Sequence, residues 1–313
     1  MTTCLITGCE GFIGSHLAEF LVGRGHKVFG TVYEANANLD GLHGRMSFLK
    51  GDLNDRGWVD EIVDQVQPDV VFHLAAQSFL TVSWQNPEET LRTNVLGTFH
   101  LLEKLQGSGH DPTVLVIGSS AVYGRRDESE MPINEDASFQ PTSMYAVSKV
   151  AEDMLGYFYH AAYHMKVIRV RPFNMTGPRK TDDACSDFAK GIAEIEVGRS
   201  DILKVGNLDT VRDFTDGRDA VRALWTLVER GNAGDIYNLC SGTARGMRQV
   251  LDTLLSLANK PVRWEVTSEK LRRTDDPIFV GSNAKLRALG WQPEIPFRQS
   301  LTDLLDFWRE RVG

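Results

Sequence analysis

Ser119, Tyr145 and Lys149 could together carry out acid–base chemistry on a carbonyl or hydroxyl group. Tyr145 and Lys149 stand four positions apart in a segment with a helical pattern, so their side chains share one face of the expected helix. An ammonium group beside a phenol stabilises the phenolate and makes the hydroxyl a usable acid or base near neutrality. Ser119 follows an apolar run typical of a strand, where its hydroxyl could orient the reacting oxygen. Each residue alone is weak evidence, but the three together predict one site.

A glycine-rich turn, TGCEGFIG at Thr7–Gly14, joins the first expected strand to the first expected helix. Gly8 permits a tight turn, Gly11 lets backbone amides approach a pyrophosphate, and Gly14 allows close helix packing. The turn therefore predicts binding of a dinucleotide, NAD or NADP. Over a nicotinamide, Ser119 would orient the substrate, Tyr145 would pass the proton, and Lys149 would tune Tyr145 and hold the ribose.

The choice between NAD and NADP stays open in the sequence. An acid at the end of the second strand would bind the NAD ribose, whereas an arginine would bind the extra phosphate of NADP. Val32–Glu34 stands there, and Glu34 is either a ribose ligand or an exposed loop carboxylate. Asp52 lies near the expected adenine edge or caps the following turn. Arg45 and Arg56, on adjoining loops, are alternative phosphate ligands.

Short apolar runs alternate with amphipathic segments along the first half of the chain. This rhythm predicts an α/β fold, a doubly wound parallel (Rossmann) sheet, with its ligands at the carboxyl ends of the strands. The expected strands are Cys4–Thr7, Val28–Val32, Met46–Leu49, Asp69–Leu74, Thr113–Gly118 and Lys166–Arg171, and the expected helices are Ile13–Gly23, Trp58–Gln65, Pro87–Gln106 and Met144–Ala162.

A smaller mixed α/β substrate-binding lobe is expected after about residue 173. We expect a dinucleotide-binding domain at 1–173, with segments near 207–241 returning to it, and the second lobe at 174–313. The lobe reads as helices, one strand and a proline-punctuated tail: helices Asp187–Val197, Arg218–Glu229 and Arg248–Ala258, and strand Asp235–Cys240.

The composition of the chain disfavours several classes of binding partner. The net charge of −8 argues against nucleic acid or anionic membrane as a partner, because both draw their affinity from positive patches. The chain has no apolar run near the roughly 18 residues of a membrane span, and Met1 leads into a strand without a basic leader. Cys4, Cys9, Cys185 and Cys240 lack metal-ligand spacing. We expect a cytoplasmic protein with free thiols and no metal.

With these motifs, the chain resembles the extended short-chain dehydrogenase/reductase family, in its nucleotide-sugar branch. The resemblance runs along essentially the whole chain. Two segments of the second lobe look like the GDP-mannose subgroup, which contains GDP-mannose 4,6-dehydratases and GDP-4-keto-6-deoxymannose reductases. The matching motifs are Thr7–Gly14, HLAAQS at His73–Ser78, TNVLGT at Thr93–Thr98, GSSAVYG at Gly118–Gly124, YAVSK at Tyr145–Lys149, RPFNMTGP at Arg171–Pro178, and, in the lobe, Lys204–Asp216 and Gly281–Pro293.

The resemblance implies that the lobe at 174–313 binds a nucleotide sugar, and it implies two sets of ligand contacts. Arginines suit a sugar diphosphate because each guanidinium makes bidentate hydrogen bonds, although Arg212 could instead pair with Asp213 or Asp216, and Asn174 could instead serve a turn. The substrate contacts are Gln77, Ser119, Ser120, Asn174, Val205, Arg212 and Arg272. The cofactor contacts are Gly8, Gly11, Phe12, Ile13, Gly14, Glu34, Asp52, Leu53, Leu74, Ala75, Ala76, Asn94, Tyr145 and Lys149.

One departure from the family pattern bears on the reaction. Dehydratases of this family carry a glutamate two residues before the tyrosine that is here Tyr123, and Ala121 stands in its place. Alanine moves no proton, so elimination of water is disfavoured, although Ser120 or a distant carboxylate could substitute. A 4-keto reductase is the favoured reading, with a GDP-linked sugar as the favoured substrate. A 4-epimerase using tightly held NAD is the alternative, and a non-catalytic dinucleotide sensor is disfavoured because the Ser/Tyr/Lys set is intact.

A second departure from the family pattern is Arg273, where the related segment tends to have proline. This residue could alter the diphosphate site.

The helices Pro87–Gln106 and Met144–Ala162 carry more apolar positions than one buried stripe needs, among them Leu91, Val95, Leu102, Met154, Leu155 and Phe158. The resemblance implies that these helices form a four-helix bundle between two copies of the chain. The alternative is that the second stripe belongs to the intramolecular core.

Overall fold

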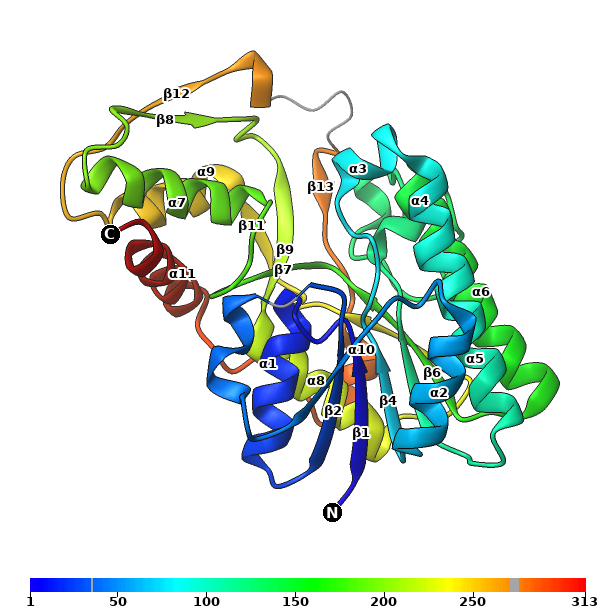
Figure 1. Cartoon of the computed structure of the whole chain (residues 1–313). Coiled ribbons are helices and arrows are strands. Elements are labelled where there is room, and N and C mark those ends of the chain that lie inside the picture. Colours follow the sequence, from blue (N-terminus) through cyan, green and yellow to red (C-terminus); the bar gives the residue numbers. More distant parts are fainter. Residues whose placement is uncertain (35, 271–275) are drawn as a thin grey trace.

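The computed structural model describes residues 1–34, 36–270 and 276–313. Seven strands form one sheet in the order β3-β2-β1-β4-β5-β6-β10, and every neighbouring pair is parallel (Figure 1). The order reverses between β1 and β4, so the ligand crevice is expected at the carboxyl ends of these strands. The predicted doubly wound fold is confirmed. The strands are β1 (Thr3–Thr7), β2 (Lys27–Val32), β3 (Ser47–Lys50), β4 (Val70–His73), β5 (Thr113–Ile117), β6 (Val167–Pro172) and β10 (Ile236–Leu239).

Helices cover both faces of this sheet, because alternate side chains of each strand point to opposite sides. On β1, Cys4 and Ile6 pack with α1 and α8, whereas Leu5 packs with α2, α5 and α6 on the other face. The helices are α1 (Phe12–Gly23), α8 (Gly217–Arg230), α2 (Arg56–Val66), α5 (Gly97–Gly107) and α6 (Met144–Tyr163), with short turns η1 (Ala37–Leu42), η3 (Ser120–Tyr123) and η4 (Glu128–Glu130) nearby.

The helix expected at Pro87–Gln106 is interrupted by a wider turn. It begins as α4 (Pro87–Leu91), continues through a π-helical turn η2 (Arg92–Leu96), and resumes as α5; a separate short helix, α3 (Leu80–Gln85), precedes it. π-turns within helices often occur at functional sites. Here the turn carries Asn94, a predicted cofactor contact.

The second lobe contains several short strands that the sequence pattern did not predict. One small sheet is built on β9, and β8 and β12 form a separate parallel pair. Helices α7, α9 and α11 surround a second apolar core (Figure 1). The elements are β7 (Asn174–Thr176), α7 (Ala184–Glu196), β8 (Ile202–Val205), β9 (Val211–Asp216), β11 (Ala244–Gly246), α9 (Met247–Leu255), β12 (Arg263–Val266), η5 (Ser268–Lys270), β13 (Ile278–Phe279) and α11 (Phe297–Val312). Helix α10 (Ala284–Ala288) instead packs on β10 in the first core.

Two features of the second half of the chain depart from a simple division into residues 1–173 and 174–313. Strand β10 lies beside β6 in the large sheet and α8 packs against α1, whereas β9, just before α8, belongs to the small sheet. The expected proline-punctuated tail contains the 16-residue helix α11, which begins directly after Pro296. Leu301, Leu304 and Leu305 bury its apolar stripe. We propose that the division near residue 173 separates the two lobes, with the chain crossing back to the first lobe for α8, β10 and α10.

Candidate active site

The glycine turn after β1 is held in close contact with the loop after β4. Gly8 adopts φ +69°, and a Cβ atom there would lie 2.7 Å from the Cα atom of Ala75. A Cβ at Gly14 would lie 2.3 Å from the Gly8 carbonyl oxygen. Gly11 stands at the N-cap of α1 and leaves the first backbone N–H groups of the helix open to an anion. This backbone geometry fits the pyrophosphate of a dinucleotide. Phe12 and Ile13 pack into the α1 side of the core.

Tyr145 and Lys149 lie at the start of α6, as the sequence predicts. The Ser143 hydroxyl caps the helix by accepting a hydrogen bond from the Ala146 N–H over 3.1 Å. Half-buried Tyr145 lies in the first turn, and the Lys149 Nζ atom lies 5.9 Å from its ring centroid. The phenol and the ammonium therefore come from consecutive turns of one helix face.

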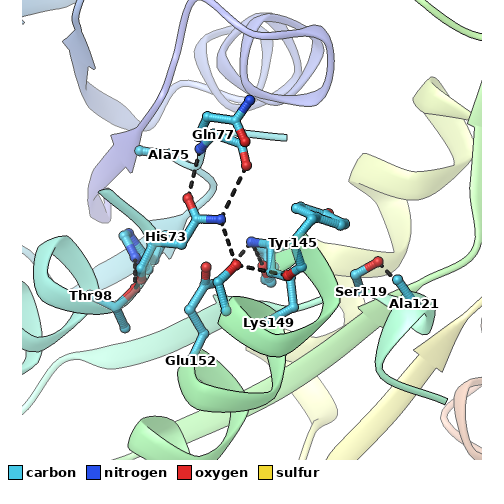
Figure 2. A network of polar contacts seen from close by, with 12 residues as sticks. His73, Ala75, Gln77, Thr98, Ser119, Ala121, Tyr145, Lys149 and Glu152 are labelled. Carbon is cyan, nitrogen blue, oxygen red and sulfur yellow. Dashed lines mark hydrogen bonds and ion pairs between the residues drawn. The ribbon is translucent and has the colours of Figure 1, made fainter. Parts of the chain in front are cut away.

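Ser119 reaches the same region from the end of β5. It is the first residue of the turn before η3, and η3 packs against α6. Its Oγ atom accepts a hydrogen bond from the Ala121 N–H over 3.1 Å. Figure 2 shows Ser119, Tyr145 and Lys149 around one region, with Ala121 beside Ser119. Ser120 is buried at the start of η3.

Lys149 is buried and doubly bound. Its ammonium donates to the Ile117 carbonyl over 3.0 Å and to Glu152 Oε2 over 2.8 Å. An ammonium has three N–H donors, so one remains for a ligand. Burial alone would lower the pKa of Lys149, but Glu152 and Tyr145 outweigh it and raise the pKa above its usual value. Lys149 therefore stays charged throughout the physiological range.

Asn94 ties the loop after β4 to the first turns of α6. Its Oδ1 atom accepts from the Gln77 N–H over 2.7 Å, and its amide donates to the Gln77 carbonyl over 3.1 Å and to Ser148 Oγ over 2.9 Å. Ser148 Oγ in turn donates to the Tyr145 carbonyl over 2.7 Å (Figure 2). Both amide hydrogens of Asn94 are used within the protein. Asn94 therefore positions this loop and the Tyr145 backbone.

His73 extends this network to the glycine turn. Thr7 Oγ1 accepts from the Ala75 N–H over 3.1 Å and hydrogen-bonds His73 Nδ1 over 2.8 Å. Thr98 Oγ1 donates to the Asn94 carbonyl over 2.5 Å and therefore accepts from His73 Nε2–H over 2.8 Å. Burial, with a smaller effect of the Lys149 charge, lowers the pKa of His73 to about 3. His73 is thus a neutral link that uses both ring nitrogens.

The loop that carries Ser119 is anchored from behind by a buried polar cluster. The Tyr123 hydroxyl donates to Asn238 Oδ1 over 2.7 Å and accepts from Arg171 Nη1 over 2.9 Å. Arg171 Nε donates to Asp153 over 2.9 Å. Burial raises the pKa of Tyr123 to about 12. Tyr123 therefore stays protonated and has a structural function.

The residues near the expected adenosine end fall into two groups. Leu53 is buried in the core and Asp52 Oδ1 accepts from the Asn54 N–H over 2.9 Å, so Asp52 caps the turn. Glu34 is exposed just beyond β2. Arg45 borders a cavity with Lys27 and Ser47, the first residues of β2 and β3. The Arg45 alternative is therefore wrong, because this is the amino edge of the sheet, whereas Arg56 starts α2, exposed, after the carboxyl end of β3.

An acid that the sequence reading missed lies at this end. The Glu10 carboxylate, inside the glycine turn, accepts a hydrogen bond from the Tyr33 N–H over 2.8 Å at the end of β2. Its Oε2 atom is buried without a hydrogen-bond partner among the described residues. Asn38 donates to the Glu10 carbonyl over 3.1 Å, and Arg311 donates to Asn38 Oδ1 over 3.4 Å. The sequence signal was an acidic residue between the glycines.

The expected substrate residues are only partly brought together. Asn174, on β7, donates to the Asp213 carbonyl of β9 over 3.3 Å, and Arg212, on β9, donates to the Asp276 carbonyl over 2.7 Å. Ser241 and Gly242 bind the Asp213 carboxylate, and Arg218 binds that of Asp216. Val205 packs in the second core, so its side chain does not join the site. Half-buried Leu74, Ala75, Ala76 and Gln77 follow β4, whereas Arg272 and Arg273 lie outside the described residues.

Within residues 1–34, 36–270 and 276–313, His, Cys, Asp and Glu side chains form no group suited to a metal ion. In the same residues, the helices lack the combination of length and apolar character that crossing a bilayer requires.

All four cysteines are buried free thiols, and burial raises the pKa of Cys4 and of Cys9 to about 12.

Known proteins are similar to this chain in sequence and in structure. The family model described as GDP-mannose 4,6 dehydratase matches residues 5–304. GDP-6-deoxy-D-mannose reductase of Pseudomonas aeruginosa is 34% identical over 310 residues, which cover 98% of this chain and 97% of that protein. The structure of RMD from Pseudomonas aeruginosa complexed with NADPH is 32% identical with a TM-score of 0.86, over 99% of this chain and 100% of that chain. UDP-glucose 4-epimerase of Thermus thermophilus, in complex with NAD, is 28% identical with a TM-score of 0.87, over 98% of both chains.

The fold and the Ser/Tyr/Lys site define an extended short-chain dehydrogenase/reductase of the nucleotide-sugar branch. Within that class, the chain belongs to the GDP-mannose 4,6-dehydratase family. The resemblance seen in the motifs is confirmed.

The neutral state of His73 predicts a pH-dependent stability. Because its pKa is lowered from 6.5 to about 3, its contribution is present above about pH 6.5 and is lost as the pH falls toward 3. We expect the advantage of wild type over His73→Gln in unfolding free energy to shrink below pH 6.5, by up to about 1.4 kcal/mol per pH unit. Urea unfolding between pH 5 and 8 measures it. The exposed His43→Gln variant is the control, and a His73 difference that does not change with pH contradicts the prediction.

Proposed function

We propose that this chain reduces the 4-keto group of a GDP-linked 4-keto-6-deoxyhexose, with a nicotinamide dinucleotide as cofactor. The observation that carries the proposal is the convergence of Ser119, Tyr145 and Lys149 beside Ala121. The set suits hydride and proton transfer, while the residue at the dehydratase glutamate position has no acidic group. The likeness to a protein named GDP-6-deoxy-D-mannose reductase supports the same reaction.

The proposed roles follow from the contacts. When bound, the cofactor supplies the hydride for the carbonyl carbon. Ser119 Oγ hydrogen-bonds the carbonyl oxygen and orients it toward Tyr145. The Tyr145 hydroxyl donates its proton to that oxygen as negative charge develops there, which completes the alcohol. Lys149 stabilises the resulting phenolate until Tyr145 regains a proton from solvent.

The diphosphate of the substrate is assigned to the second lobe. We assign Asn174 and Arg212 to it because both lie on paired strands β7 and β9, next to the carboxyl end of β6. Arg272 is the third proposed ligand, assigned from the sequence alone. Guanidinium groups give this acidic chain a local cationic site for an anionic substrate. The four buried thiols support a reducing, cytoplasmic setting.

Replacing Tyr145 with phenylalanine tests the reaction. We expect Tyr145→Phe to lower kcat for a GDP-4-keto-6-deoxyhexose by about 100-fold or more, because proton transfer contributes that much, while the fold stays intact. The assay follows oxidation of NADH or NADPH and the sugar product across GDP-, UDP- and dTDP-linked sugars and their 4-keto-6-deoxy forms. Stoichiometric oxidation with a keto sugar supports the reductase. Interconversion of two sugars without added reduced cofactor would overturn it in favour of a 4-epimerase, and near wild-type turnover by Tyr145→Phe would refute the proton relay.

The adenosine end of the site favours NAD(H). The Glu10 carboxylate reaches the end of β2, and its Oε2 atom is buried without a hydrogen-bond partner in the part of the chain that the structure describes. Exposed Glu34 follows β2. Carboxylates here accept hydrogen bonds from a ribose hydroxyl and repel the extra phosphate of NADP(H). The structure of RMD from Pseudomonas aeruginosa is complexed with NADPH, so the preference for NAD(H) proposed for this chain differs from the cofactor bound in that relative. Arg311, bound to Asn38, is the cation that could offset Glu10.

A single substitution tests this preference. We expect Glu10→Gln to lower the ratio of kcat/KM for NADH over NADPH by about tenfold, since removing the charge removes about 1.4 kcal/mol of discrimination. Asp40→Asn, which replaces an exposed acid of η1, is the matched control and should leave the ratio unchanged. A wild-type enzyme that prefers NADPH and loses that preference in Arg311→Ala would show that Arg311 decides the cofactor instead.

We also propose a homodimer through α6 and the α4–α5 helix. Leu102 is buried and Leu155 packs against the core, but Met154 and Phe158 are 39% and 48% exposed. Val147 shares their stripe of α6, at 40% exposure. Large apolar groups gathered on one exposed helix face are typical of an interface. Two copies of this face would give the expected four-helix bundle.

Charges placed on this face should separate the copies. We expect the double variant Met154→Glu and Phe158→Glu to run as a monomer in light scattering coupled to size exclusion, where wild type runs as a dimer, because a buried interface does not accept unpaired charge. Val197→Glu, an exposed apolar position beyond α7, is the control. Wild type that is monomeric at micromolar concentration contradicts the proposal.

A further inference from the structure

We propose that Glu152 is a positioning residue that fixes the Lys149 ammonium and partly neutralises its charge at Tyr145. The inference rests on the proposed roles of Tyr145 and Lys149. It assigns a function to an acid that lies outside the three-residue set, three positions after Lys149 on the same helix face.

The contact is short and fully enclosed. Glu152 Oε2 accepts from Lys149 Nζ over 2.8 Å, and the side chains of Lys149 and Glu152 are 4% and 1% exposed. Lys149 also donates to the Ile117 carbonyl at the end of β5. Figure 2 shows Glu152 on the far side of Lys149 from Ser119. The ammonium is therefore held between a strand end and a carboxylate, with Tyr145 one turn earlier.

Stability alone does not account for this pair. A buried ion pair is often no better for stability than apolar side chains of the same size, because both charges lose their hydration. Glu152 adds a further cost, since its Oε1 atom is buried with no hydrogen-bond partner in the described part of the chain. An apolar residue at 152 would avoid both costs, but it would leave the Lys149 ammonium without a counterion.

The carboxylate moderates the charge that Tyr145 experiences. Lys149 stabilises the phenolate, and a nearby negative charge reduces that effect. Asp153, the other acid beside the pair, binds Arg169 and Arg171 on β6, and His73 on β4 is neutral. Burial raises the pKa of Glu152 to about 7, against the opposing effect of Lys149. Loss of this one charge should therefore change the protonation of Tyr145.

The variant Glu152→Gln removes the negative charge of this side chain but keeps its shape. In Glu152→Gln the amide oxygen still accepts from Lys149, but the ammonium is no longer neutralised. We expect the tyrosinate absorbance step that is missing in Tyr145→Phe to move to lower pH by about one unit. This titration uses the protein without cofactor. In the reductase assay, the alkaline limb of kcat/KM should fall at correspondingly lower pH, because Tyr145 must be protonated to donate.

Two further variants separate positioning from a structural role. Glu152→Asp keeps the charge and should return the tyrosinate step toward its wild-type position. Glu196→Gln removes another buried acid, paired with Arg309 in the second lobe, and should leave both pH profiles unchanged. The proposal is overturned if Glu152→Gln and wild type titrate alike, or if Glu196→Gln shifts the profiles equally.

Failure of this inference is distinguishable from failure of the proposed function. If wild type turns over no keto sugar, or Tyr145→Phe remains active, the proposed reaction is wrong. If wild type is active, Tyr145→Phe is inactive and Glu152→Gln leaves the tyrosinate step in place, the reaction stands and the role of Glu152 is rejected.

Discussion

The buried ammonium of Lys149 is the constraint around which the site is organised. A charge that loses its hydration must be bound on several sides, and Lys149 is bound by the Ile117 carbonyl and the Glu152 carboxylate. These contacts fix the first turns of α6 against the end of β5. Tyr145 on α6 and Ser119 after β5 are therefore placed relative to each other by the same contacts that keep the ammonium stable.

A second set of polar contacts links the catalytic helix α6 to the glycine turn, the predicted binding site of the dinucleotide. Gln77, Asn94 and Ser148 connect the loop after β4 with α6, and His73 connects Thr98 of α5 with Thr7, where β1 enters the glycine turn. Asn94, Ser148 and His73 are buried, so an unmade hydrogen bond there would cost free energy. Because the chain of contacts is continuous, the predicted cofactor loop and the predicted catalytic helix behave as one unit, which suits a reaction that needs the substrate and the cofactor in a fixed relation.

Much of the fold was predictable from the sequence because local patterns agreed with the final structure. Except for the edge strand β3, the strands of the large sheet are largely buried apolar runs, and the glycine turn between β1 and α1 has no room for larger residues at Gly8 and Gly14. The second lobe was predicted less well. Its strands β7, β11 and β13 have two or three residues and gain their order from pairing with β9, which no local pattern reveals. Helix α11 was missed because prolines preceding it read as a broken tail.

The sequence by itself determined the residue types that do the chemistry and their order along the chain: the glycine turn, the serine after a strand, and the tyrosine and lysine one helical turn apart. Spacing along a helix or at a strand end is a local property, so it can be read directly. Only the tertiary structure decided which other groups touch these residues. Glu10 reaches Tyr33 across the end of β2, Arg45 lies at the opposite edge of the sheet, and His73 is kept neutral by burial. Burial, charge pairing and the edge of the sheet on which a loop lies depend on contacts between segments far apart in the chain, and those contacts exist only once the chain has folded.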